Sequence, residues 1–182
     1  MGIVEIFAVA IALAMDALAV SVMAGIRQAP LTRRQIFRLS FHFGLFQFMM
    51  PVIGAAVGEG LALYISSFGR WIAFGLLTII GVKMIYEALK SEKNENRGDL
   101  TRGWTLIGLA VATSIDALAV GLSIAILKQS VLVPAIIIGL VCAAISILGA
   151  KFGSRIGDRY SHWAEITGGI ILIAIGIKTA MF

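Results

Sequence analysis

Charged residues and cysteines are what this sequence has least of. Only 14% of its 182 residues are Asp, Glu, Lys or Arg, whereas a soluble domain carries about 25%. The single cysteine, Cys142, excludes a disulfide framework and a cysteine-rich metal site, and we interpret it as a small packing residue. With 59% hydrophobic residues and a mean hydropathy of +0.97, the composition is that of an integral membrane protein.

Long apolar runs predict an all-α membrane protein of six transmembrane helices. A helix needs roughly 20 residues to cross about 30 Å of hydrocarbon. The expected spans are 3–26, 36–63, 71–89, 104–127, 132–152 and 163–181. The linkers between them are short, so residues 1–182 are expected to form a single integral membrane domain without a soluble domain.

The distribution of basic residues predicts the orientation. Most of them lie in or beside the first, third and fifth linkers: Arg27, Arg33, Arg34, Arg38, Lys90, Lys93, Arg97, Arg102, Lys151, Arg155 and Arg159. The positive-inside rule places those linkers in the cytoplasm and both termini outside it. The net charge of +5 is therefore interpreted as a topology signal, and a nucleic-acid partner is not expected because no basic face on a folded module is present.

The sequence also repeats itself. Residues 14–26 (AMDALAVSVMAGI) and 114–126 (SIDALAVGLSIAI) share the run Asp-Ala-Leu-Ala-Val. At a spacing of 95, Gly44, Gly54, Gly58 and Gly81-Val82-Lys83 match Gly139, Gly149, Gly153 and Gly176-Ile177-Lys178. We expect two three-helix repeats, 1–89 and 104–182, joined by a cytoplasmic linker at 90–103. Because three spans are an odd number, the repeats would be inverted, as in many secondary transporters.

Each repeat carries one aspartate, Asp16 or Asp116, near the middle of its first span. A carboxylate at the bilayer centre costs about 2.5–3.5 kcal/mol on insertion scales. No arginine lies at that depth, and Lys178 is expected near the outer end of its span. Two carboxylates without a fixed cation indicate a bound or transported divalent cation, with protons in its place when it leaves.

Other oxygens accompany the aspartates. Thr113 lies one turn before Asp116, and Pro51 cannot donate to the carbonyl of Gln47, whose amide lies near the middle of the second span. Ser146 takes the place of Pro51 in the second repeat. The predicted metal ligands are therefore Asp16, Asp116, Gln47, Thr113 and Ser146, an oxygen set suited to Mg²⁺, Ca²⁺ or Mn²⁺.

Structural interpretations of the same residues stay open. The aspartates could share one proton as a structural pair, and the Thr113 hydroxyl could bond only its own helix. Pro51 could be only a kink, and Gln47 only an interhelical hydrogen bond. The glycine pairs 54/58 and 149/153 are expected to serve helix packing.

Four segments resemble the MntP family of manganese efflux pumps in the LysE superfamily. They are ALAMDALAVSVMAGI (12–26), FGLFQFMMPVIGAAVG (43–58), ATSIDALAVGLSIAIL (112–127) and AEITGGIILIAIGIK (164–178). The resemblance implies a multi-pass exporter of the cell inner membrane that lowers cytoplasmic Mn²⁺, with no cofactor besides the transported ion. The family's membrane-embedded acids map onto Asp16 and Asp116, and some relatives carry glutamate in place of Gln47. Manganese comes from the resemblance, since the residues alone indicate only a divalent cation.

The expected mechanism is proton-coupled alternating access, with the metal ion and the lipid bilayer as partners and homo-oligomerisation left open. No G-x-x-x-x-G-K-[ST] motif is present, which argues against ATP hydrolysis by this chain. The alternatives are an exporter of a small amino acid or of another divalent cation, a cation channel, and a structural membrane subunit. An intramembrane aspartyl enzyme is disfavoured because the short linkers leave little for substrate recognition.

Overall fold

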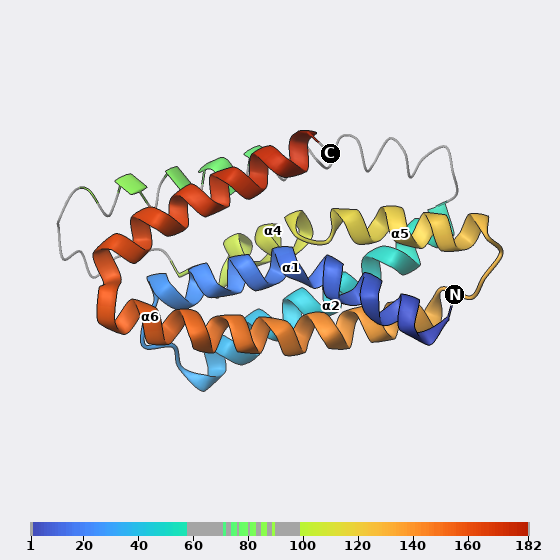
Figure 1. The fold of residues 1–182 in the computed structure, drawn as a ribbon, viewed down its shortest axis with the longest axis horizontal. Helices are drawn as coiled ribbons and strands as arrows, with labels where there is room; N and C mark the ends of the chain where they lie inside the picture. The colour runs from blue at the N-terminus through green and yellow to red at the C-terminus, as the bar shows by residue number, and fades with distance from the viewer. Residues whose placement is uncertain are drawn as a thin grey trace.

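The computed structural model describes residues 2–57, 99–181 and scattered helical positions between 71 and 89, and this part of the chain is helical (Figure 1). Side chains are not described at 126, 157–165, 167, 168, 172, 176, 179 and 180. The helices are α1 (Ile3–Arg27), α2 (Arg33–Val57), α4 (Gly103–Ala112), α5 (Ile115–Ile126) and α6 (Leu132–Met181). The all-α prediction is confirmed for these residues.

Three helical segments of the described chain are long and apolar enough to cross a membrane: Ile3–Arg27, Arg33–Val57 and Leu132–Ile156. A fourth span results if α4 and α5 are counted as one bent helix. The chain is therefore a multi-pass membrane protein. The linker expected after residue 63, most of the one expected at 90–103, and Lys83 and Gly58 of the repeat pattern lie outside the described residues.

The span predicted at 104–127 is not one continuous helix, because the chain breaks between α4 and α5. The two helices meet at Thr113 and Ser114 with a bend of 42°. Thr113 Oγ1 donates to the Leu109 carbonyl at 3.0 Å, and Ser114 Oγ donates to the Ala110 carbonyl at 2.7 Å. Hydroxyls that bond back to the preceding turn compete with the helix ladder and bend it.

The linker predicted at 153–162 is helical in conformation, because α6 is helical throughout Leu132–Met181. Its C-terminal half turns back and runs antiparallel to its N-terminal half (Figure 1). The last proline of the chain is Pro134, so no residue in this stretch lacks a backbone donor. Glycine alone weakens a helix by about 1 kcal/mol, which does not end it.

Glycines allow close approach of helices in three places. A Cβ added at Gly54 of α2 would overlap the Leu118 carbonyl of α5, and one at Gly149 of α6 would lie 2.9 Å from the Leu18 carbonyl of α1. Gly44 and Gly139 face each other, with such a Cβ 2.9 Å and 2.8 Å from the other residue's carbonyl oxygen. Small residues at these crossings give close backbone packing in membranes.

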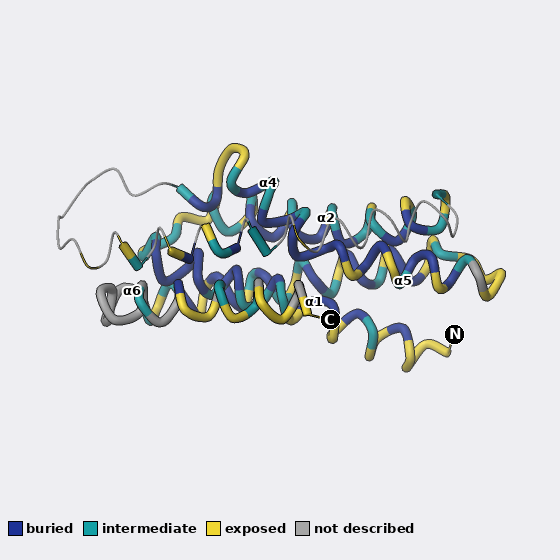
Figure 2. The backbone as a smooth tube through the Cα atoms, turned by 90° about the horizontal axis from the view of Figure 1, so that it is seen from above, coloured by how far each residue is buried: buried dark blue, intermediate teal, exposed yellow. Residues whose placement is uncertain are grey.

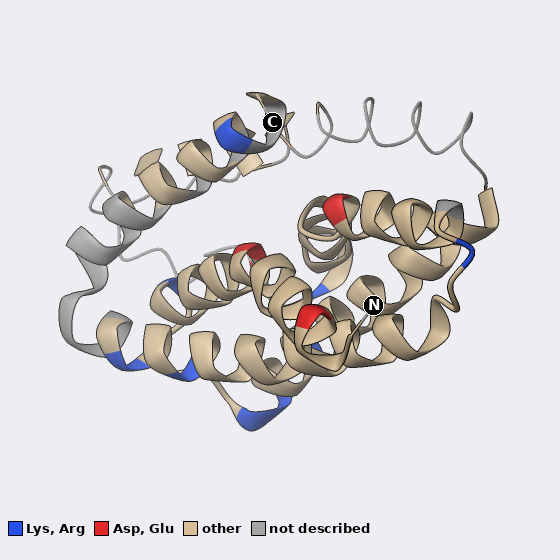
Figure 3. Ribbon diagram, turned by 45° about the vertical axis from the view of Figure 1, so that its right-hand side comes forward, with Lys and Arg blue, Asp and Glu red and all other residues tan. Residues whose placement is uncertain are grey.

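Burial follows the helix faces. Buried positions lie where helices meet, and exposed ones lie on the outward faces (Figure 2). The outward positions include large apolar side chains such as Ile11, Trp104 and Leu140. Lys and Arg lie mainly at helix ends and in connecting segments (Figure 3). An apolar outer face with charges at its ends suits a lipid environment.

Candidate metal site

The two predicted aspartates lie near each other. Asp16 is on α1 between the fully buried Ala14 and Ala17, and Asp116 is in the first turn of α5, directly after the helix break. The charge of Asp16 acts on Asp116, so the carboxylates are within electrostatic reach of one another. Asp16 is half-buried and Asp116 is exposed, so neither is sealed inside the protein.

The break gives Asp116 a backbone partner that Asp16 does not share. Asp116 Oδ1 accepts a hydrogen bond of 2.8 Å from the N–H of Ala117. In an unbroken helix that N–H would donate to the carbonyl of Thr113. The carbonyl of Thr113 is thereby left for another donor.

Gln47 supplies that donor. Its side chain is fully buried, and Nε2 donates to the Thr113 carbonyl at 2.9 Å and to the Leu13 carbonyl at 3.2 Å. Leu13 and Thr113 each stand three residues before an aspartate and occupy the same position in the repeated segments. Gln47 therefore joins the two aspartate-bearing helices at equivalent points. The interhelical interpretation of Gln47 is correct for its amide nitrogen.

The amide oxygen of Gln47, unlike the amide nitrogen, makes no hydrogen bond with the described residues. This atom, Oε1, is buried. An unsatisfied buried polar atom costs about 1–3 kcal/mol. Because both N–H groups of the amide are used, Oε1 is an acceptor available to a ligand close to the aspartate-bearing turns.

The remaining two predicted ligands are buried as well. Thr113 Oγ1 donates its proton to the carbonyls of Leu109 and Ala110, so only its lone pairs are available. Ser146 on α6 is fully buried one turn after Cys142, on which the charge of Asp116 acts. Ser146 Oγ has no partner of hydrogen-bond geometry in the described part, although Cys142 is near enough to interact with it.

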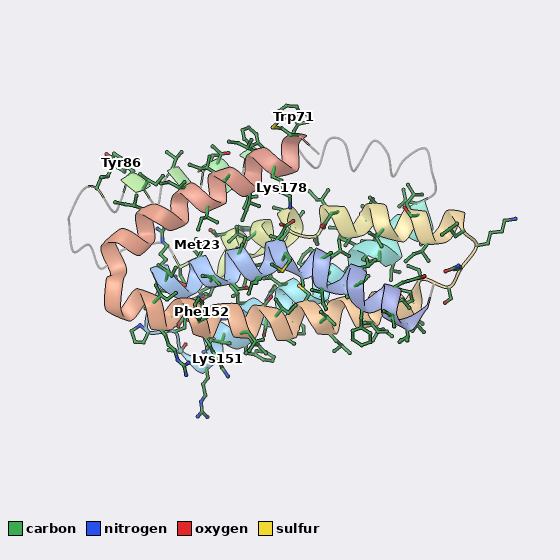
Figure 4. All side chains as sticks on the ribbon, in the orientation of Figure 1. Met23, Trp71, Tyr86, Lys151, Phe152 and Lys178 are labelled. Atoms are coloured by element: carbon green, nitrogen blue, oxygen red, sulfur yellow. The ribbon has the colours of Figure 1, made fainter. Side chains whose placement is uncertain are left out.

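Lys178 is the residue whose position the sequence did not predict. It was expected near the outer end of its span, away from the aspartates. Instead, its charge acts on both Asp16 and Asp116, and its side chain points from the C-terminal end of α6 toward α4 and α5 (Figure 4). The fold-back of α6 causes this, because it lays the last turn of α6 over the middle of the bundle.

The described residues contain no group of three or more His, Cys, Asp or Glu able to hold a metal ion. The candidate site thus offers two carboxylates and neutral oxygens.

Comparison with known proteins identifies the family. A family model described as "Putative manganese efflux pump" matches residues 30–180. A relative named "Putative manganese efflux pump MntP" from Syntrophotalea carbinolica is 50% identical over 179 residues, covering 98% of this chain and 95% of its own. Relatives of the same name from Nitratidesulfovibrio vulgaris and Dehalococcoides mccartyi are 49% and 46% identical, each over 98% of this chain and over 90% and 93% of their own. No solved structure matches.

Proposed function

Because this chain belongs to the MntP family of manganese efflux pumps, we propose that it exports Mn²⁺ through a site built on Asp16 and Asp116. The family is one of transporters and not of enzymes. The observation that carries the proposal is that two carboxylates lie within electrostatic reach of each other beside the α4–α5 break, where Gln47 has an unpartnered buried amide oxygen. Mn²⁺ is the substrate that the family name supplies.

The ligand set follows from this arrangement. Asp16 and Asp116 provide two negative charges that balance the doubly charged ion, and Gln47 Oε1 provides a neutral oxygen. The lone pairs of Thr113 and Ser146 complete the oxygen-rich surroundings. Manganese accepts carboxylate, carbonyl and hydroxyl oxygens of this kind.

We propose further that the whole chain forms six spans in two inverted repeats, 1–89 and 104–182, with the linker 90–103 in the cytoplasm and both termini outside. The glycine contacts support this. Gly54 against Leu118 and Gly149 against Leu18 pair residues that are equivalent in the two repeats, and Gly44 meets its own equivalent, Gly139. A two-fold axis in the membrane plane would generate both kinds of contact.

The third helices of the repeats call for a different spacing. A Cβ at Gly81 would lie 2.8 Å from Ile173 Cγ1, and one at Gly169 would lie 2.6 Å from Ile85 Cγ1. These reciprocal contacts relate Gly81 to Gly169 and Ile85 to Ile173, rather than Gly81 to Gly176 as the sequence match suggests. The two-fold relation we propose therefore includes a shift of about two helical turns in the last helix of each repeat.

The transport cycle is proposed to be alternating access coupled to protons. The ionised aspartates bind Mn²⁺ from the cytoplasm, one repeat moves against the other, and protonation outside releases the ion. Moving two charges out against an inside-negative potential costs roughly 4.6 kcal/mol per 100 mV, so a coupled proton gradient is the fitting drive.

The test is ⁵⁴Mn²⁺ uptake into everted membrane vesicles. Asp16→Asn and Asp116→Asn should each abolish saturable uptake at normal expression, whereas Glu5→Gln, at an exposed position near the start of α1, should not. Collapse of the proton gradient should stop uptake by the unmodified protein. Full uptake by either asparagine variant would refute the site, and uptake without a proton gradient would refute the coupling.

A further inference from the structure

Lys178 lies on the face of α6 that packs onto the aspartate-bearing part of the bundle. Ile175, one turn earlier, packs against the largest buried cluster, which draws residues from α1, α2, α4 and α6 and includes Ala14 and Ala17 near Asp16. Residues three apart on a helix share a face. Figure 4 shows the Lys178 side chain extending inward from this face instead of away from the bundle.

The position of Lys178 matters for the charge balance of the candidate metal site. Two carboxylates in apolar surroundings need a compensating charge or protons whenever no metal ion is bound, and any carboxylate that stays ionised needs a cation. Among the basic residues in the described ranges, Lys178 is the one whose charge acts on both Asp16 and Asp116. The charge of Arg38, by contrast, acts on Asp99 in the segment before α4.

The chemistry of lysine suits a temporary role. An ammonium group donates up to three hydrogen bonds but has no lone pair, so it can pair with carboxylates and cannot bind a metal ion. Its flexible four-carbon stem can carry the charge toward or away from the site. Lys178 is exposed, so its side chain is not locked in place by packing.

We propose that Lys178 is the counter-cation of the ion-free site and competes with Mn²⁺ for Asp16 and Asp116. The arriving ion displaces the ammonium group, and the ammonium group returns to the carboxylates as the ion leaves. Lys178 thereby weakens resting affinity for the metal and assists its release. This inference rests on the proposed function, since it assumes that the aspartates bind the metal.

Equilibrium binding of ⁵⁴Mn²⁺ to the full chain in lipid nanodiscs tests the proposal. Lys178→Met should lower the Mn²⁺ concentration for half-saturation by about tenfold, because a unit charge acting across several ångströms of protein has an effect of this order. Lys178→Arg keeps the charge and should bind as the unmodified protein does. Lys151→Met is the matched control, since Lys151 is exposed on the other half of α6 (Figure 4), and it should also leave binding unchanged.

The results separate this inference from the proposed function. Tighter binding by Lys178→Met alone supports a competing charge, and unchanged or weaker binding overturns it. Absence of saturable Mn²⁺ binding to the unmodified protein, or full binding by Asp16→Asn and Asp116→Asn, would refute the proposed function instead.

A second measurement compares a charged and an uncharged side chain at position 178 of the same folded variant. Lys178→Cys in a Cys142→Ala background is modified either with an aminoethyl thiosulfonate, which restores a positive charge, or with a methyl thiosulfonate, which does not. The methylated form should bind Mn²⁺ more tightly than the aminoethylated form. Equal binding by the two forms overturns the proposal even if Lys178→Met does not fold.

Discussion

The same five residues, Asp-Ala-Leu-Ala-Val, lie in two different structural settings in this protein. In α1 they belong to an unbroken helix of 25 residues, and Asp16 is half-buried within it. In the second segment they open α5 after a 42° bend, and Asp116 is exposed with a backbone N–H as its partner. The difference arises just upstream, where Leu13 and Ala14 in one segment correspond to Thr113 and Ser114 in the other.

This contrast shows how a duplicated motif can acquire two roles. Hydroxyls at Thr113 and Ser114 divert backbone acceptors and end α4, whereas apolar residues leave α1 continuous. Gln47 then bonds the carbonyl before each aspartate, so the straight helix and the broken one remain joined at matching points. One aspartate thus lies within a continuous helix and the other directly after a helix break.

The largest effect is expected at the glycine crossings of the two segments. Gly54→Ala places a methyl group onto the Leu118 carbonyl of α5, and Gly149→Ala brings one within 2.9 Å of the Leu18 carbonyl of α1. Overpacking of this kind costs about 1–3 kcal/mol or more. Thermal unfolding in detergent should show a larger loss for Gly54→Ala than for Gly149→Ala. Gly75→Ala, with no atom within 4 Å of the added methyl, is the control, and equal losses in all three variants would contradict the prediction.

Sequence reasoning reached the helical class, the membrane setting and the family, because composition and long apolar runs depend on no tertiary detail. It also predicts one depth for Asp16 and Asp116, since each lies near the middle of an expected span. It missed the α4–α5 break because a helix tolerates Thr and Ser unless another donor takes the freed carbonyl, and that donor, Gln47, is distant in the sequence. It missed the direction of Lys178 because depth along a helix does not specify which face meets the bundle.

The second prediction concerns Gln47, which hydrogen-bonds both aspartate-bearing segments. Gln47→Met keeps the volume of the side chain but removes the donor to Leu13 and Thr113 and the free Oε1. Loss of these bonds should reduce stability by about 1–3 kcal/mol and weaken Mn²⁺ binding. Thermal unfolding and ⁵⁴Mn²⁺ binding measure the two effects. Gln35→Met on the same helix opens the Thr32–Gln35 capping box at the start of α2, so it should lower stability slightly but leave Mn²⁺ binding unchanged. Normal metal binding by Gln47→Met would exclude Oε1 as a ligand.

A smaller effect is expected when the second segment is made to resemble the first. Thr113→Ala combined with Ser114→Ala removes the back-bonding hydroxyls, so α4 and α5 should straighten toward the geometry of α1. Lost hydrogen bonds of this strength would lower the transport rate by roughly three- to tenfold. Ser123→Ala is the control, because its hydroxyl bonds the Ala119 carbonyl on the exposed face of α5. Unchanged transport by the double variant would show that the break is dispensable.

The smallest effect is expected at Asp99, which links the end of α1 to the stretch before α4. Its Oδ1 accepts from Gln28 Nε2 at 2.8 Å, next to the end of α1, and from Thr101 N and Oγ1 at 2.8 and 2.6 Å, just before α4. Burial raises the pKa of Asp99. The hydrogen bonds from Thr101 and Gln28 and the charge of Arg38 together lower the pKa by more than burial raises it, so the pKa lies below its ordinary value.

A depressed pKa fixes how this contact depends on pH. The folded protein favours the ionised carboxylate, so its contribution to stability is complete above the ordinary pKa of about 4 and is lost as the pH falls through the lower folded value. Asp99→Asn should therefore be slightly less stable than the unmodified protein at pH 7, and the difference between their unfolding temperatures should shrink toward pH 3. Mn²⁺ transport at pH 7 should stay unchanged, because Asp99 lies in the segment before α4 and not among the predicted metal ligands. A difference that grew on acidification would mean that Asp99 is protonated more readily in the folded protein, contrary to its hydrogen bonds.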